Sequence, residues 1–166
     1  MKKINKMLAT VVSTSMLFVS TAYASTSSTS HSSSNVTITP VTTQSVGQKQ
    51  NDVYLAAEKL VHNPPRHISF DTPGFVQKVY SAVNVKLPRT ILEQSKVGKR
   101  ISNRSQLQKG DLVFFNLVNS NKNEVTFDGI YLGKNMFAAL TTHGLMEINT
   151  QSEYWSNKFT FGVRIL

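Results

Sequence analysis

The chain has 166 residues, of which 18 are Lys or Arg and 9 are Asp or Glu, and its formal net charge is +9. It contains no cysteine, which excludes disulfides, thiolate metal sites and a cysteine nucleophile. The basic residues are scattered without interleaved aromatic residues, which argues against a nucleic-acid-binding module. A basic charge favours anionic polymers or acidic surfaces instead.

The N-terminal residues have the pattern of a secretory signal. Residues 1–6 (MKKINK) are basic, residues 7–19 are apolar, and Ala22-Tyr23-Ala24 forms a small-residue cleavage site. A retained membrane anchor is the weaker alternative, because the apolar run is short and interrupted by Thr and Ser. We therefore predict that residues 1–24 are a signal peptide and that the protein is secreted without a stable membrane anchor.

Residues 25–50 are almost all Ser, Thr, Gln, Asn and Val. Such a segment buries too little apolar surface to offset the entropy lost on ordering, so we predict a disordered leader rich in Ser and Thr. Residues 51–166 have the size of one ordinary domain with a single core. The sequence thus predicts a signal peptide, a leader and one folded domain.

Three helices are predicted in the first half of this domain. Residues 52–61 place apolar side chains on one face, with Asp52 as the N-cap, and two prolines end the pattern. A second helix starts within FDTPGFVQKVY, with Thr72 as the N-cap and a proline at the first helical position, and extends to about Asn84. A short helical segment is expected over residues 91–95.

The second half of the domain changes to runs of β-branched and aromatic residues that turns separate. A polar loop is expected at residues 119–123, and a hairpin turn at Gly133-Lys134-Asn135. Strands are predicted over residues 111–117, 125–132, 136–140, 145–148 and 160–165. Helices first and short hairpin-linked strands afterwards predict an α+β fold, in which N-terminal helices pack on an antiparallel β-sheet.

Four short motifs occur in order along the domain. They are FDTPG from Phe70, LPRT from Leu87, GDLVFF from Gly110 and TFDGIYLG from Thr126. This order resembles the NlpC-type peptidoglycan endopeptidases, papain-like enzymes that cut wall peptides next to D-glutamate. In that family Phe-Asp-Cys-Ser-Gly starts the central helix, and Ser-His-Val-Gly-Ile-Tyr-Leu-Gly forms a later strand. The resemblance implies a papain-like NlpC-type fold for residues 51–166.

The resemblance also locates the catalytic positions of the family, and this chain departs from the pattern at each of them. The nucleophilic cysteine falls on Thr72, the general-base histidine on Phe127, and the polar residue that orients the base on Ala139. A threonine hydroxyl is far less acidic than a thiol and needs an adjacent base, which Phe and Ala cannot provide. We therefore expect no intact catalytic set, and an apolar groove beside Phe127.

Polar residues near these positions define a candidate ligand groove. The groove includes two positions at which the catalytic residues of the family are replaced, Thr72 and Phe127. Its other members are Arg66, His67, Asp71, Asp128 and His143. A relocated Thr72–His143 pair is the catalytic interpretation. We favour the alternative, in which His143 faces solvent in a polar turn and Asp128 makes a surface or loop hydrogen bond.

Other residues are interpreted as structural. Arg89 contacts a ligand carboxylate or phosphate, or it holds its turn to the central helix, and we favour the second. Asp111 is expected to tie down the turn before its strand. The aromatic side chains of the second half are assigned to the core or to packing on the sheet. They are Phe114, Phe115, Phe137, Trp155 and Phe161.

These observations favour a secreted pseudoenzyme, which binds cell-wall material or modulates a cell-wall partner without cysteine-peptidase activity. The expected partners are peptidoglycan, an anionic wall polymer or a cell-wall enzyme, at the wall of a Gram-positive bacterium. One alternative is a divergent D,L-endopeptidase that uses Thr72, and another is a structural or regulatory protein that uses the sheet surface. No cofactor is expected, and the four histidines show no metal-ligand spacing.

Overall fold

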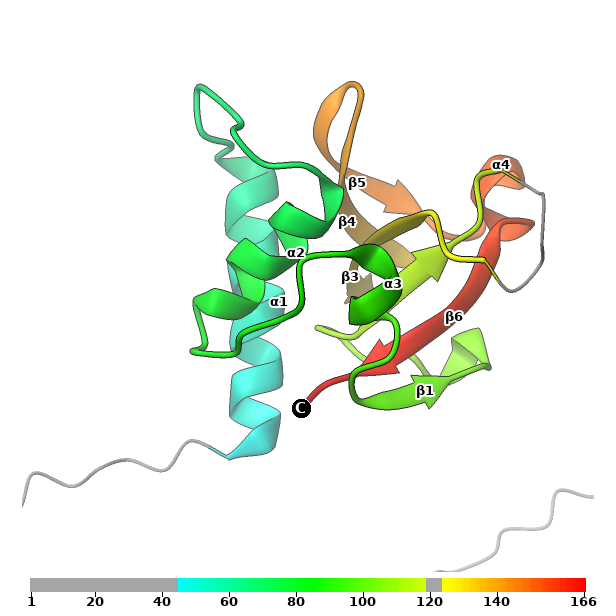
Figure 1. The fold of residues 1–166 in the computed structure, drawn as a ribbon, viewed down its shortest axis with the longest axis horizontal. Helices are drawn as coiled ribbons and strands as arrows, with labels where there is room; N and C mark the ends of the chain where they lie inside the picture. Colours follow the sequence, from blue (N-terminus) through cyan, green and yellow to red (C-terminus); the bar gives the residue numbers. More distant parts are fainter. Residues whose placement is uncertain (1–44, 119–123) are drawn as a thin grey trace, which may run out of the picture. The chain divides into compact units, whose positions relative to one another are not determined.

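The computed structural model describes residues 45–118 and 124–166, with helices first and most strands afterwards (Figure 1). The predicted signal peptide, the leader up to residue 44 and the loop at 119–123 lie outside the described residues. The helices are α1 (Val46–His62), α2 (Thr72–Ser81), α3 (Ile91–Gln94) and α4 (Glu153–Ser156), with a 3-10 turn at Arg104–Gln106. The strands are β1 (Lys99–Ile101), β2 (Leu112–Phe115), β3 (Phe127–Gly133), β4 (Met136–Thr141), β5 (Gly144–Asn149) and β6 (Phe159–Arg164).

Helix α1 begins six residues earlier than the sequence predicts, inside the segment assigned to the leader. Ser45 is its N-cap, because the Ser45 hydroxyl accepts a hydrogen bond of 3.2 Å from the backbone N–H of Gln48. The prediction that Asp52 caps this helix is therefore wrong, since Asp52 lies within it. Gln and Lys at residues 48–50 have good helix propensity, so they extend the helix beyond its amphipathic part.

The six strands form one antiparallel sheet in the order β1-β6-β2-β3-β4-β5. Strands β3, β4 and β5 are consecutive hairpins, with Ile130 opposite Ala138 and Ala139 opposite Met146. Helices α1 and α2 pack on β3 and β4, and Figure 1 shows both helices on one side of the sheet. The predicted α+β architecture, with helices against an antiparallel sheet, is confirmed.

Two apolar clusters lie on the two faces of the sheet. Along β2, Leu112 and Phe114 belong to the cluster under the helices, whereas Val113 and Phe115 belong to the other cluster. This division follows from the alternation of side chains along a strand. The second cluster is rich in aromatic rings and is packed against α4 through Trp155. Both faces of β2 and β3 are therefore buried.

A buried ion pair fixes the start of β2 to the rest of the domain. The Asp111 side chain is fully buried, and its Oδ2 lies 2.7 Å from Nη2 of Arg164 in β6. The same carboxylate accepts hydrogen bonds from the Gln50 side chain of α1 (2.9 Å) and from the backbone N–H of Gln108 (2.7 Å). The prediction that Asp111 ties down this turn is confirmed, and the ion pair and the Gln50 bond also join three distant parts of the chain.

The glycine of this turn is required by its surroundings. Gly110 has φ of +88°, and a Cβ there would lie 2.6 Å from the backbone oxygen of Gln50. Its own carbonyl accepts a hydrogen bond of 2.6 Å from the buried Tyr80 hydroxyl of α2. A side chain at this position would therefore push α1 away and strain the backbone.

Candidate functional site

The N-terminus of α2 is capped by the residue before the one predicted. Asp71 is the N-cap, since its Oδ1 accepts a hydrogen bond of 3.0 Å from the backbone N–H of Gly74, and Thr72 is the first helical residue. Nη2 of Arg89 donates to Asp71 Oδ2 at 2.8 Å, and this hydrogen bond lowers the pKa of Asp71. The prediction that Arg89 holds its turn to the helix is thus confirmed.

The Thr72 hydroxyl is committed to a structural hydrogen bond. Its Oγ1 donates to the backbone carbonyl of Leu140 in β4 at 3.2 Å. A carbonyl oxygen cannot take up the proton of an attacking hydroxyl, and in residues 45–118 and 124–166 no histidine or carboxylate is hydrogen-bonded to this group. Thr72 therefore fastens the start of α2 to β4 and has no activating base.

Phe127 and Ala139 lie in the second apolar cluster, on the sheet face opposite the one that α2 covers. The Phe127 ring centroid is 5.2 Å from that of Trp155 and 6.4 Å from that of Phe115, and Phe127 is 9% exposed. Ala139 is fully buried. These two positions thus contribute aromatic and aliphatic packing and no acid–base group.

Asp128 differs from the prediction of a surface or loop hydrogen bond. It follows Phe127 in β3, so its side chain points to the face that carries Ile130 and Leu132 of the first cluster. It is fully buried, and neither carboxylate oxygen has a hydrogen-bond partner among the described residues. Burial, with a smaller contribution from the negative charge of Asp71, raises the pKa of Asp128 to about 7.

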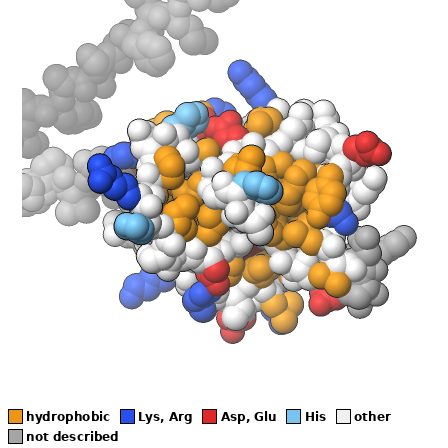
Figure 2. All heavy atoms as spheres, turned by 90° about the horizontal axis from the view of Figure 1, so that it is seen from above, with side chains coloured by type: hydrophobic (Ala, Val, Ile, Leu, Met, Phe, Trp, Pro, Cys, Tyr) orange, Lys and Arg blue, Asp and Glu red, His pale blue; other side chains and the backbone are white. Residues whose placement is uncertain are grey.

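An open pocket of about 640 Å³ lies beside Phe127. Figure 2 shows hydrophobic side chains gathered on the upper face of the domain, on both sides of a histidine. The pocket is bounded by the β4–β5 turn, by β5, by the end of β2 and by α4. Its lining residues are Leu117, Phe127, Thr141, Thr142, His143, Met146, Glu147, Ile148, Asn149, Ser152, Tyr154 and Trp155.

The structure brings only part of the predicted ligand groove to this pocket. His143 is exposed in the β4–β5 turn, as expected, and it lines the pocket rim with Phe127. Arg66 and His67 are exposed in the loop between α1 and α2 and do not line the pocket. Thr72 does not line the pocket. Its hydroxyl is hydrogen-bonded to the carbonyl of Leu140, which precedes the lining residue Thr141.

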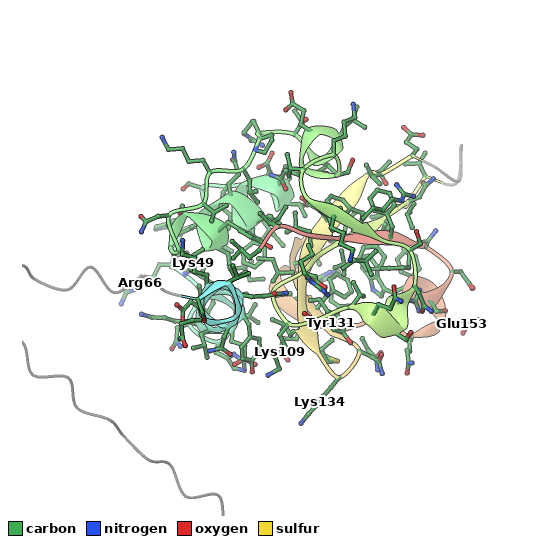
Figure 3. The ribbon with its side chains drawn as sticks, turned by 90° about the horizontal axis from the view of Figure 1, so that it is seen from below. Lys49, Arg66, Lys109, Tyr131, Lys134 and Glu153 are labelled. Atoms are coloured by element: carbon green, nitrogen blue, oxygen red, sulfur yellow. The ribbon has the colours of Figure 1, made fainter. Side chains whose placement is uncertain are left out.

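The described residues that line the pocket include no Lys or Arg, although the Lys158 ammonium lies 5.0 Å from the centre of the ring of the lining residue Tyr154. Figure 3 shows Lys109 beside α1, where its ammonium nitrogen lies 3.6 Å from the centre of the Tyr54 ring. The same view shows Lys134 projecting from the turn between β3 and β4. That turn and the β4–β5 turn lie at opposite ends of β4, so Lys134 is remote from the pocket.

The sequence does not predict that helix α4 borders a pocket. The prediction that Trp155 packs in the core or on the sheet is confirmed, because its ring packs against the second apolar cluster. Its contribution to a pocket was not predicted. The polar residues on both sides of Tyr154 and Trp155 indicate that this segment lies at the surface. They are Ser152, Glu153, Ser156 and Asn157. In the structure Tyr154 is 55% exposed, and Trp155 is only partly buried.

Two further properties bear on the chemistry of the described residues. Among them, no group of three or more His, Asp or Glu side chains is placed to hold a metal ion. None of their helices has the length and apolar character needed to cross a membrane.

Residues 47–164 match the model of the NlpC/P60 family. With the fold described above, this match shows that the chain belongs to the NlpC/P60 family. Over 98 residues it is 38% identical to a probable endopeptidase NlpC homologue of Haemophilus influenzae, a match that covers 58% of this chain and 49% of that relative. The chain therefore spans about half the length of this curated relative.

Solved structures of the family share the fold. A Staphylococcus aureus protein of the NLP/P60 family, described as similar to lipoprotein, has a TM-score of 0.61 and 26% identity, over 75% of this chain and 43% of that one. RipD of Mycobacterium tuberculosis has a TM-score of 0.55 and 20% identity, over 72% of this chain and 98% of that one. RipD is described as a non-catalytic NlpC/p60 domain protein adapted to peptidoglycan binding.

Proposed function

We propose that the protein is a secreted NlpC/P60 pseudoenzyme, which binds cell-wall peptidoglycan or modulates a cell-wall enzyme without peptidase activity. One observation carries this proposal. By the motif resemblance, the family's three catalytic positions fall on Thr72, Phe127 and Ala139, none of which has or supplies a base, and an open pocket lies beside Phe127. The non-catalytic use of this fold in RipD supports the proposal.

The location at the cell wall is part of the proposal. The basic first residues, the apolar run and the Ala-Tyr-Ala site support export, and the family relationship supports a wall ligand. A divergent D,L-endopeptidase that uses Thr72 is the second candidate, because curated relatives include probable endopeptidases. The hydrogen bond from Thr72 to the Leu140 carbonyl argues against that candidate.

The test combines binding with cleavage. The purified chain is mixed with sacculi and sedimented, and in parallel it is incubated with muropeptides whose products are identified by mass spectrometry. We expect co-sedimentation without cleavage, and the same behaviour in Thr72→Ala. Cleavage that disappears in Thr72→Ala would overturn the proposal in favour of the endopeptidase. Failure to bind both sacculi and any cell-wall enzyme would also overturn it.

A further inference from the structure

The aromatic side of the pocket beside Phe127 is held rigidly. The Trp155 ring centroid lies 5.0 Å from that of Phe115 and 5.1 Å from that of Phe137, both edge-on. Helix α4, which carries Trp155, is fastened from behind by Arg104, whose guanidinium donates to the carbonyls of Thr150 (3.2 Å) and Ser156 (2.9 Å). The aromatic wall is therefore positioned before any ligand arrives, which reduces the entropy lost on binding.

The described residues at the rim of the pocket are exposed and mostly uncharged. Tyr154 is 55% exposed and Met146 is 40% exposed, so both offer apolar surface to a ligand. Glu147 is the acidic residue among the lining residues, and its carboxylate is turned toward α1, where it lies 3.6 Å from Nε2 of His62. The remaining polar lining residues are hydroxyl and amide side chains and one histidine. They are Thr141, Thr142, His143, Asn149 and Ser152.

We propose that this pocket binds an uncharged N-acetylated sugar ring of the glycan strand, in contact with Tyr154 and Trp155. The inference rests on the proposed wall-binding function and names the part of the wall polymer that is recognised. A pyranose ring offers an apolar C–H face that packs on aromatic rings, and its hydroxyl and amide groups match an uncharged polar rim. A stem peptide presents several carboxylates, and the described residues that line the pocket include no Lys or Arg to pair with them. The nearby Lys158 ammonium lies 5.0 Å from the centre of the Tyr154 ring and is not among the lining residues.

The single tryptophan makes the proposal directly measurable, since Trp155 is the only Trp in the chain and it lines the pocket. The purified chain is titrated with a neutral N-acetylglucosamine oligosaccharide, and separately with a sugar-free stem peptide, while Trp fluorescence is recorded. We expect a saturable change with the oligosaccharide alone. Tyr154→Ala should weaken this binding about tenfold, the effect of losing one aromatic contact. Leu92→Ala is the matched control, because Leu92 is 57% exposed but lies in α3.

The outcomes separate this inference from the proposed function. If sacculi bind but the oligosaccharide gives no response, or if Tyr154→Ala binds it normally, the sugar site is overturned and the wall-binding function stands. Binding of the stem peptide alone likewise overturns the sugar site. If the oligosaccharide binds and Tyr154→Ala weakens it, while sacculi and cell-wall enzymes do not bind, the sugar site stands and the proposed function fails.

Discussion

The carboxyl group of Asp128 is fully buried, and no residue that the structure describes forms a hydrogen bond with it. Its ordinary pKa of 3.8 is raised to about 7, first by burial and then by the charge of Asp71. The folded state therefore holds this proton more tightly than the unfolded state does. The resulting contribution to stability is fully present below about pH 4, and it is lost as the pH rises toward and through 7.

Asp128→Asn tests this pH dependence. We expect the variant to be more stable than the parent at pH 8 by at least about 1.4 kcal/mol, the equivalent of one pKa unit, and to differ little near pH 4. The measurement is urea denaturation at several pH values. Glu153→Gln, an exposed acid in α4, is the control and should not change the pH profile. Equal effects of Asp128→Asn at pH 4 and pH 8 would contradict the assignment.

At the scale of elements, the Asp111–Arg164 ion pair lies where β2, β6 and α1 meet. It joins the start of β2 to β6, and the Gln50 side chain brings in α1. The Asp111 carboxylate is fully buried, so removing the guanidinium would leave a buried charge without its counter-ion.

Arg164→Met should therefore destabilise the domain by about 3 kcal/mol, the usual result of breaking a buried ion pair from one side. Chemical denaturation followed by circular dichroism gives the free energy of unfolding. Lys99→Met is the control, since Lys99 is exposed directly opposite Arg164 in the pairing of β1 with β6. A loss for Arg164→Met no larger than that for Lys99→Met would show that the pair has little effect on stability.

Element predictions succeeded where the sequence pattern itself fixes the structure. Strands β2 to β5 were found within about two residues, because runs of β-branched and aromatic residues between turns specify them locally. Strand β1 has three residues, Lys-Arg-Ile, and was missed because it forms only through pairing with β6. Helix α4 has four residues and was missed because packing on the second cluster, and no periodic pattern, determines it.

The candidate site was less predictable than the fold. The prediction that Thr72 and Phe127 occupy the family's catalytic positions rests on the motif alone. The motif does not predict the burial of Asp128, because an acidic residue in a strand normally faces solvent. The Thr72 bond to Leu140 spans 68 residues of sequence, so no local pattern contains it.

At the scale of the whole molecule, the net positive charge and the pocket lead us to expect different salt dependences of wall binding. The chain is strongly basic, which favours anionic polymers, whereas no Lys or Arg occurs among the pocket-lining residues that the structure describes. Binding through the pocket depends on short-range contacts, and binding through the scattered Lys and Arg residues depends on salt.

We expect the affinity for sacculi to change less than about twofold between low salt and 0.5 M NaCl, because screening acts on exposed charges and hardly on aromatic contacts. Sedimentation of the chain with intact sacculi, and with sacculi stripped of anionic polymers, measures this. A steep loss of binding with salt, confined to the intact sacculi, would instead assign wall binding to the basic surface.

The packing of Phe127 has a consequence for substitutions at this position. The Phe127 ring, at the position that the motif resemblance aligns with the family's histidine, contacts Phe115 and Trp155 and is part of the second apolar cluster. Restoring a histidine there would bury a polar ring among aromatic neighbours before any nucleophile existed to use it. A histidine introduced at this position alone would therefore weaken folding, and it would do so in a chain that contains no cysteine.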